Sequence, residues 1–352
     1  MSEERKRILK MLESGAISVE EAEKMLEQVE ESNFLSEHVE WEEFEKEEPQ
    51  KQSTKKKVFD FLNNTVKKIK NADLDFNFGP SIDVSHVFFY QATTFNQLQL
   101  EIENGSVDVR AWDEEDVRIE CKAKVYKVND AEQAKKLLLE QLEVHLDNKD
   151  LKIKLESKKM KADLILYVPR RAYEEGKVRL FNGPISLKGF YVNTLNCKTS
   201  NGDIELQKMK GDEWEVKAVN SDIRLVDVNV KNSEVEALTG SIQVEGEFGK
   251  LDAQLVNGSI HCKWFGELGH TGFFKTTTGS IDLNLPPHRA IDGELKTTIG
   301  SIHCDLPEHY IIRSDSEVLK KQLHFQTKKE ANATLFIEAE TKTGSIKVKP
   351  IS

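Results

Sequence analysis

The sequence of 352 residues predicts a mainly β protein, a parallel β-solenoid of about 19–21 residues per turn preceded by a small α-helical hairpin. Three observations carry this prediction. A six-residue signature recurs through the second half of the chain, its spacing is nearly constant, and apolar residues keep the same phase around each copy. A repeat of this length is one supersecondary turn, which cannot bury its apolar face alone and has to stack on its neighbours.

The signature is a corner pair followed by an alternating strand, as in Thr278–Leu283, which reads Thr-Gly-Ser-Ile-Asp-Leu. Successive corner glycines are 19, 19, 19, 18, 21, 21 and 44 residues apart, with Ser221 in place of glycine in one copy. The last step is about two periods and predicts a turn whose signature is lost. The copies begin at Asn182, Asn201, Asn220, Thr239, Asn257, Thr278, Ile299 and Thr343.

The phase of the apolar residues predicts two inward-facing strands per turn. The second and fourth residues after each glycine are apolar, a period of two typical of a half-buried strand. The third and fifth residues before the glycine are apolar or threonine, and glycine tolerates the corner between the two strands. We expect equivalent strands to pair in parallel, so that the isoleucines form an internal ladder. A series of antiparallel hairpins is the competing interpretation, because Asn-Gly is also a hairpin signal.

The solenoid is expected to span residues 84–352, with an irregular first section over 84–170. That section should contain a strand over Val117–Tyr126, a helix capped by Asn129 with Glu132, and a hairpin of Glu143–Leu146 with Leu151–Leu155. Regular turns are expected over 180–305, and a degenerate turn with a final rung over 306–350.

Residues 1–32 predict a short helical hairpin, because Ser18 and Glu21 form a capping box that opens its second helix. Two short helices cannot cover their own apolar stripe, so the hairpin is expected to bind a protein partner or a second copy. The alternative is an N-terminal ornament without a partner. The candidate partner-binding residues are Ile8, Leu12, Met25 and Leu26.

Residues 33–57 predict a charged flexible linker, and residues 58–83 an amphipathic helix with a lead-in to the solenoid. The helix has an apolar face flanked by lysines. The simpler interpretation is a cap over the first rung of the solenoid. The alternative is a helix lying in the interface of an anionic membrane. The candidate membrane-interface residues are Phe59, Phe61, Leu62, Lys67 and Lys68.

Charge and hydropathy argue against several classes of protein. The net charge is −11, and residues 1–50 hold sixteen glutamates against six basic residues, so the rest of the chain is nearly neutral. This balance gives no electrostatic footprint for nucleic acid. No apolar run reaches the length of a membrane span, and the first residues do not form a signal-peptide core. We expect a cytoplasmic protein, peripheral at the membrane if the amphipathic helix binds there, with surface exposure as the alternative.

No catalytic, cofactor or metal residues are predicted. Asp203, Asp222 and Asp282 lie at corner positions, where solvated side chains are expected, and no phosphate-binding glycine motif is present. Two His-Cys pairs, at 261–262 and 303–304, occupy the same phase two turns apart in the expected stack. That spacing is roughly 9.6 Å, too far for a disulfide or one shared zinc ion.

The four cysteines are therefore expected to be free core thiols, as in a reducing compartment. They are Cys121, Cys197, Cys262 and Cys304.

The spaced signatures at Asn201–Leu206, Thr278–Leu283 and Thr343–Val348 resemble the adhesin-type β-solenoid domain of the YvlB-like and LiaX-like bacterial proteins. The leading segment Leu12–Ala22 resembles the SHOCT-type helical hairpin that precedes this domain in them. The resemblance implies a Gram-positive protein linked to the cell-envelope response to antimicrobial peptides, with no catalytic residues to carry over. The predicted function is a non-enzymatic scaffold or sensor, and the alternative is a surface adhesin or a glycan-binding or glycan-processing protein.

Overall fold

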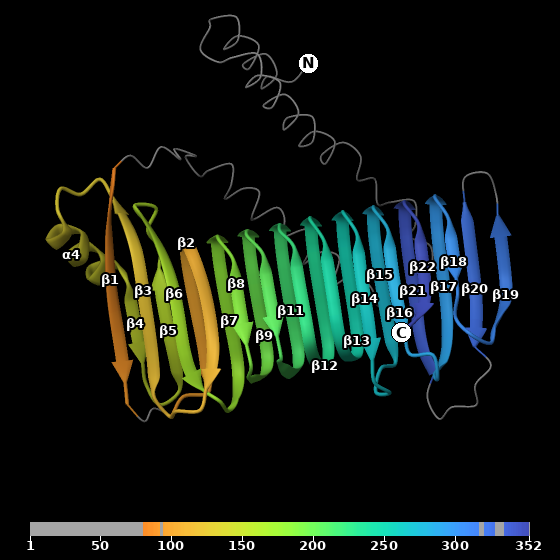
Figure 1. Cartoon of the computed structure of the whole chain (residues 1–352), viewed down its shortest axis with the longest axis horizontal. Coiled ribbons are helices and arrows are strands. Elements are labelled where there is room, and N and C mark those ends of the chain that lie inside the picture. The colour runs from red at the N-terminus through yellow and green to blue at the C-terminus, as the bar shows by residue number, and fades with distance from the viewer. Residues whose placement is uncertain (1–79, 92–93, 317–319, 328–333, 352) are drawn as a thin grey trace, which may run out of the picture. The chain divides into compact units, whose positions relative to one another are not determined.

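The computed structural model of the protein describes residues 80–91, 94–316, 320–327 and 334–351. All of them belong to the second of two units in the chain, residues 72–352. The predicted parallel solenoid is confirmed. In the described part, 22 strands form one continuous sheet that coils along a single stack, with one helix near its first end (Figure 1).

The strands and the helix have the following bounds: β1 Ser81–Tyr90, β2 Gln97–Trp112, β3 Val117–Tyr126, α4 Ala131–Gln141, β4 Glu143–Leu146, β5 Asp150–Leu155, β6 Met160–Pro169, β7 Ala172–Asn182, β8 Ile185–Lys188, β9 Tyr191–Asn201, β10 Ile204–Gln207, β11 Lys210–Asn220, β12 Ile223–Thr239, β13 Ile242–Asn257, β14 Ile260–Phe265, β15 Thr271–Thr278, β16 Ile281–Leu285, β17 Ala290–Ile299, β18 Ile302–Cys304, β19 His309–Ser316, β20 Lys321–Thr327, β21 Thr334–Thr343 and β22 Ile346–Pro350.

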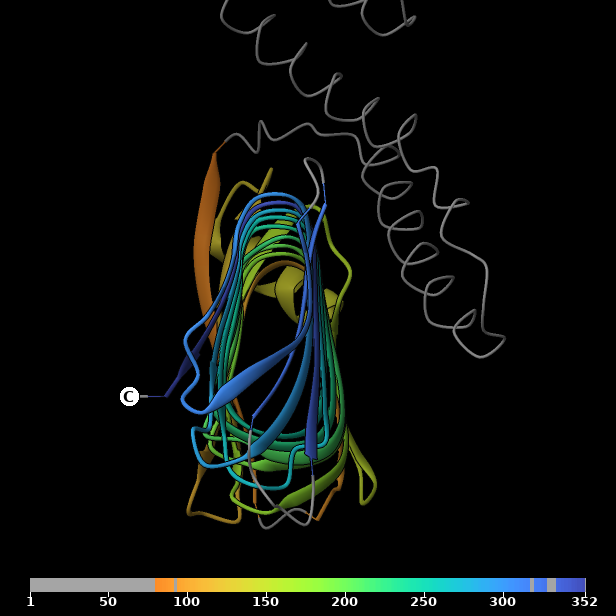
Figure 2. The ribbon, with the colours of Figure 1, turned by 90° about the vertical axis from the view of Figure 1, so that its right-hand side faces the viewer.

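Each coil has two long sides joined at the signature corner, so that the coils overlie one another as a flattened loop when seen along the stack (Figure 2). We call the strand that enters the corner the first side and the strand that leaves it the second side. Second-side strands pair in parallel and in register, with Ile204 opposite both Ile185 and Ile223. The isoleucines of this ladder are almost completely buried, except Ile302 in β18, which is half-buried. The predicted ladder is therefore the centre of the core.

Close stacking explains the corner glycines. Gly258 has a φ of +136°, and a Cβ atom there would lie 1.7 Å from the carbonyl oxygen of Gly240 in the preceding coil. Only glycine fits that approach. Ser221 occupies the same position in its own coil, and its φ angle is not positive. Its hydroxyl accepts a hydrogen bond from the backbone N–H of Gly202 at 3.1 Å.

The order of the coils differs from the order of the sequence at the C-terminal end. β21 pairs with β15 on one edge and with β17 on the other, and β22 lies likewise between β16 and β18 (Figure 1). The last coil of the chain is thus inserted between two coils that are consecutive in sequence. The prediction of a degenerate turn before the final rung is wrong, because residues 309–327 instead form β19 and β20, an antiparallel pair that extends β17.

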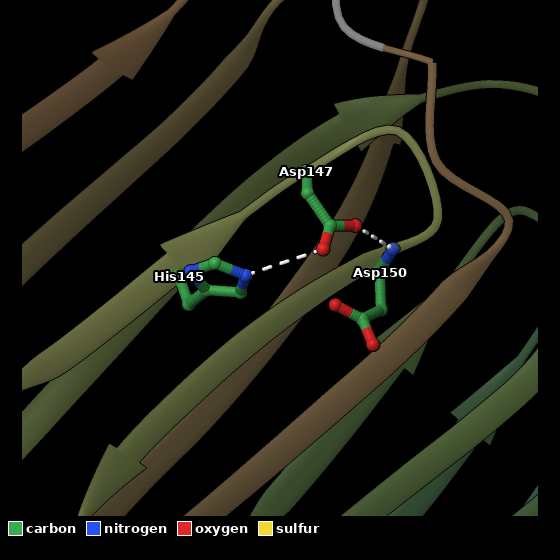
Figure 3. Close-up of side chains that lie close together, drawn as sticks. All are labelled: His145, Asp147 and Asp150. Carbon is green, nitrogen blue, oxygen red and sulfur yellow. Dashed lines mark hydrogen bonds and ion pairs between the residues drawn. The ribbon is translucent and has the colours of Figure 1, made fainter.

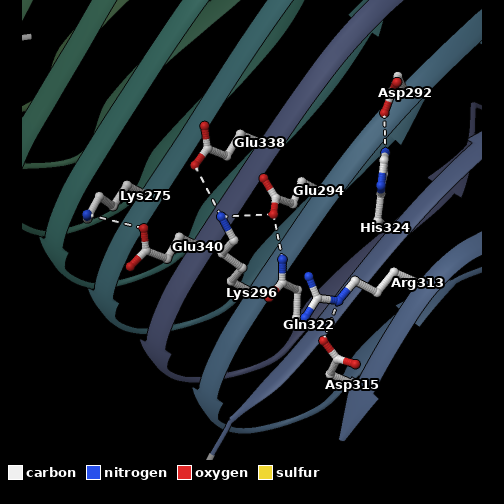
Figure 4. Close-up of polar contacts among 10 residues, drawn as sticks. All are labelled: Lys275, Asp292, Glu294, Lys296, Arg313, Asp315, Gln322, His324, Glu338 and Glu340. Carbon is white, nitrogen blue, oxygen red and sulfur yellow. Dashed lines mark hydrogen bonds and ion pairs between the residues drawn. The ribbon is translucent and has the colours of Figure 1, made fainter. Parts of the chain in front are cut away.

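Ion pairs on the outer surface of the first side match the inserted coil to its neighbours (Figure 4). Glu340 of β21 pairs with Lys275 of β15 at 3.3 Å, and Glu338 of β21 approaches Lys296 of β17 at 3.9 Å. Glu340 also lies in register between the two lysines. Direct pairing of β15 with β17 would place Lys275 opposite Lys296, an unfavourable pair of like charges.

The N-terminal end repeats the same arrangement. β2 lies between β5 and β7 on the first side and between β6 and β8 on the second side. At each end of the stack, the chain therefore passes once over an inserted coil. Each of the two connecting segments contains an arginine. Arg170 donates to the carbonyl of Gly189 at 2.8 Å and pairs with Asp113, and the buried Arg289 donates to the carbonyl of Gly269.

Other features of the irregular first section largely follow the prediction. The strand at Val117–Tyr126 and the hairpin of β4 with β5 are confirmed. The N-cap of α4 is Asp130 rather than Asn129, because the Asp130 carboxylate accepts from the N–H of Gln133 at 2.8 Å. β1 begins at Ser81, three residues before the expected start of the solenoid.

Candidate functional site

The residues predicted to bind partners or membrane all lie outside the described residues. These are Ile8, Leu12, Met25 and Leu26 of the hairpin and Phe59, Phe61, Leu62, Lys67 and Lys68 of the amphipathic segment. In the part of the chain that the structure describes, no helix combines the length and apolarity needed to cross a membrane.

The corner side chains are committed to hydrogen bonds between coils. Asn182 donates to Asn104 at 2.9 Å, Asn201 to Asn182 at 2.8 Å, and Asn220 to Asn201 at 3.3 Å. Such a ladder fixes neighbouring corners in register. It leaves these amides little capacity to recognise a ligand.

The corner aspartates serve the same purpose. Asp203 accepts from the backbone N–H of Asp222 at 3.1 Å, and Asp222 accepts from the N–H and the hydroxyl of Ser241, both at 2.8 Å. Asp282 instead pairs with His261 of the preceding coil at 3.1 Å. These carboxylates lie on separate coils and bond along the stack, so they do not converge on one groove as a glycosidase pair would.

A buried ionic cluster lies among the outward-facing side chains of the first-side strands. Lys217 of β11 is only 2% exposed, and its ammonium lies 2.7 Å from Glu236 and 2.9 Å from both Glu215 and Glu234. Lys198 pairs with Glu215 at 2.6 Å. The cluster therefore joins three coils through two lysines and three glutamates.

Burial and charge act in opposite directions on this cluster. Burial alone would lower the pKa of Lys217, but the carboxylates of Glu236, Glu234 and Glu215 outweigh it and raise that pKa. Burial raises the pKa of Glu236 to about 7, and the attraction of Lys217 offsets only part of that rise. One shared lysine cannot compensate three carboxylates fully, so the most buried carboxylate binds a proton most readily. A lysine held charged is neither a nucleophile nor a base.

Among the described residues, one group has the composition of a cation site: His145, Asp147 and Asp150, whose ligand atoms lie within 4.8 Å of one another (Figure 3). Its geometry is explained by the β4–β5 turn. Asp147 accepts from the backbone N–H groups of Asp150 at 2.9 Å and Lys149 at 2.8 Å, and these hydrogen bonds lower its pKa to about 2. Asp150 is neutralised by Lys152 at 2.7 Å.

The cysteines occupy the expected core positions, with one correction to their spacing. Cys262 points inward and is buried, whereas Cys304 is only half-buried near the end of the stack. Because β22 is inserted, Cys262 and Cys304 are three strand steps apart rather than two. Burial raises the pKa of Cys121 to about 12, which makes this thiol a poor nucleophile.

The outer surface beside β1 carries a striped patch of apolar and charged side chains that the sequence pattern did not indicate. In register across the strands, Phe89 of β1 is followed by Arg118 of β3, Tyr167 of β6 and Arg110 of β2. The Arg110 and Arg118 guanidinium carbons lie 5.8 and 5.9 Å from the Tyr167 ring centroid. The adjacent row has Val87, Glu120, Ile165 and Asp108 at the same four strands.

The two positive charges of the striped patch are matched by two carboxylates. Arg118 pairs with Glu120 at 2.7 Å, and Arg110 pairs with Asp108. Apolar pairs on β1 and β6 thus alternate with ion pairs on β3 and β2. Aromatic and arginine side chains are enriched in protein interfaces, which makes this surface the strongest candidate for contact in the described part of the chain.

Comparison with known proteins agrees with this architecture. A model of the Toastrack DUF4097 family matches residues 95–349, and a SHOCT-like domain matches residues 3–33. The uncharacterised protein YvlB of Bacillus subtilis (strain 168) is 34% identical over 361 residues, covering 99% of each chain.

The solved structures that this chain matches have low sequence identity to it. A candidate lipid-binding protein from Parabacteroides distasonis is 12% identical, with a TM-score of 0.41 over 75% of this chain and 96% of that one. A candidate adhesin from Bacteroides fragilis is also 12% identical, with a TM-score of 0.38 over 76% of this chain and 97% of that one. From the family match and the YvlB relative, this chain belongs to the Toastrack DUF4097 family, with a SHOCT-like segment ahead of its Toastrack domain.

Proposed function

We propose that this protein is a non-enzymatic scaffold in the response to cell-envelope stress, binding a protein or membrane partner through its N-terminal segment. The observation that supports this proposal is the use of polar side chains in the solenoid. The corner amides and carboxylates bond along the stack, and the buried lysine is held charged by three glutamates. A solenoid of this kind is a rigid support, and binding is left to its ends and to the attached segment.

The N-terminal segment suits a tethered binding module. The SHOCT-like match covers residues 3–33, and a charged linker is expected to follow it. A module on a flexible tether raises the effective concentration of its partner beside the scaffold. The link to envelope stress follows from the resemblance to LiaX-like proteins.

Deletion of residues 1–32 tests the role of the hairpin. The shortened protein should keep the unfolding midpoint of the solenoid and lose its association with the partner, measured by affinity capture from envelope-stressed cells. In the full chain, Leu12→Asp with Met25→Asp should reproduce the loss. The matched control, Ser2→Asp with Ser32→Asp, adds the same charge away from the apolar stripe and should have no effect. Unchanged capture after the deletion would assign binding to residues 33–352.

Vesicle binding tests the membrane role separately. Phe59→Glu with Leu62→Glu should reduce co-sedimentation with anionic phospholipid vesicles, because both changes remove apolar contacts with the interface and add negative charge. Asn63→Glu with Asn64→Glu adds the same charge off the apolar face and should reduce binding much less. Equal reduction by both pairs would mean that only net charge matters, and no vesicle binding by the wild-type chain would remove the membrane from the proposal.

A further inference from the structure

β1 is the first strand of the stack in the part of the chain that the structure describes, and its own sequence lacks the residues that usually protect a sheet edge. Among the described residues it pairs only with β3, over ten consecutive residues without a bulge. It contains no proline or lysine, and Asp83 is its one acidic residue. An edge of this kind is a template for another strand. At the other end of the stack, β19 is interrupted by a register shift between Ile311 and Arg313 and carries an Arg313–Asp315 ion pair.

Both faces of β1 are incompletely covered. On the outer face Val87 and Phe89 are 51% and 53% exposed. On the inner face Ile82, Val84 and Phe88 are only half-buried against the core, although α4 lies against this strand. One further strand along β1 would cover apolar surface on both sides of the sheet.

We propose that β1 is a dimerisation strand, to which β1 of a second copy of this chain adds in antiparallel orientation. The sequence of β1 is suited to pairing with itself. If two β1 strands overlap along most of their length, the two-fold axis passes through Ser85 or His86. In both registers the outward-facing residues of one copy lie opposite outward-facing residues of the other. In either register Asp83 faces Val87 or Phe89 of the second copy, so the two carboxylates do not meet.

This geometry also limits the assembly. A two-fold contact uses the same surface on both copies and closes after two chains, whereas a contact between unlike ends would continue as a filament. The striped patches of the two copies would then lie side by side across the new strand pair, with Val87 and Phe89 at the centre. The dimer does not depend on the proposed function, because it uses β1 and not residues 1–32.

Sedimentation velocity of the full chain tests the dimer. The wild-type protein should shift from monomer to dimer with concentration, and Val87→Lys with Phe89→Lys should hold it as a monomer, because edge lysines oppose strand pairing. The unfolding midpoint of the monomer should change little, since both side chains are already half exposed. Leu268→Lys with Phe336→Lys, two exposed apolar residues away from β1, is the matched control and should leave the dimer intact.

Cross-linking tests the position of the two-fold axis. Ser85→Cys should form covalent dimers with a short bifunctional thiol reagent, and Ser81→Cys should not, because its symmetry mate would lie at the far end of the paired strands. A wild-type protein that stays monomeric at all concentrations would overturn the proposal, whether another segment or another protein covers β1. A dimer that survives Val87→Lys with Phe89→Lys but is lost on deletion of residues 1–32 would also overturn it.

Discussion

Threonine occupies a core-facing column of the first side because its hydroxyl has a fixed partner there. Thr276 donates to the carbonyl of Gly258 at 3.0 Å, and Thr341 to that of Gly279 at 2.9 Å, both across to the neighbouring coil. Thr199 and Thr297 make the equivalent bond. A buried hydroxyl is tolerated when it is hydrogen-bonded, so one residue satisfies itself and a corner carbonyl together. The isoleucine column offers no such partner.

Ile242→Asp tests that difference. A carboxylate at this fully buried position would have no counter-charge, and we expect a loss of about 3–5 kcal/mol in the free energy of unfolding. Urea unfolding should show a strongly reduced midpoint or no cooperative transition. The neighbouring Gln243→Asp, on the outer surface, should cost far less. Equal effects of the two substitutions would contradict the assigned strand phase.

Glu236→Gln tests the buried cluster through pH. The folded-state pKa of Glu236 is raised to about 7 from an ordinary value of 4.5, so the protonated carboxyl stabilises the fold. That contribution is complete below pH 4.5 and is lost as the pH rises through 7. The variant should therefore lack a decline in unfolding free energy of roughly 3 kcal/mol across this window. The exposed Glu174→Gln is the control, and parallel pH curves for wild type and Glu236→Gln would refute the assignment.

At the scale of elements, the coils are nearly interchangeable, and their neighbours are chosen by outer side chains. The coils of the regular section share one type of corner, an inward isoleucine column and the same backbone register. What distinguishes the slot for β21 is the pair of lysines, Lys275 and Lys296, that flank its Glu340. The charges on the outer surface of this slot favour a strand that carries glutamate there.

A cysteine pair can measure this order in the full chain. Ser301 and Ser345 lie on adjacent coils with hydroxyl oxygens 2.9 Å apart. Ser301→Cys with Ser345→Cys should form a disulfide on mild oxidation, seen by mass spectrometry. Ser280→Cys with Ser301→Cys joins coils that are consecutive in sequence, but β22 separates them by roughly 9.6 Å, beyond the reach of a disulfide. The opposite pattern of cross-links would restore the sequential order.

At the scale of the whole solenoid, both ends of the described chain are interleaved with segments distant in sequence. β2 is enclosed by strands that follow it by about 50 to 80 residues, and β21 is enclosed by strands that precede it. Contacts this distant in sequence cannot form by adding coils one after another. The last section of the stack can therefore be completed only when the C-terminal coil is present.

Removal of residues 334–352 should open the stack rather than trim its end. We expect hydrogen exchange to lose protection in both flanking coils, residues 271–285 and 290–304, because the lysines of β15 and β17 oppose direct closure. Residues 185–245, farther along the stack, should keep their protection. Retained protection in 271–285 would mean that the C-terminal coil is not enclosed.

The sequence by itself determined the class of fold, the phase of each strand and the residues of the core. The alternation around each signature decides which side chains point inward, and this depends only on local periodicity. The cores at Ile204, Ile242 and Ile281 followed directly. The helix in the first section was also evident, with its cap misplaced by one residue because Asn129 and Asp130 are both good caps.

Only the tertiary structure decided which coils are neighbours and where charged side chains meet. A repeat whose units present identical edges can pair with any other unit, so periodicity carries no information on their order. The Lys217 cluster depends on three coils, and the striped patch depends on β1, β3, β6 and β2 lying side by side. Within one strand, each of these side chains is simply an outward residue at an alternating position, and its partners exist only once the coils are stacked.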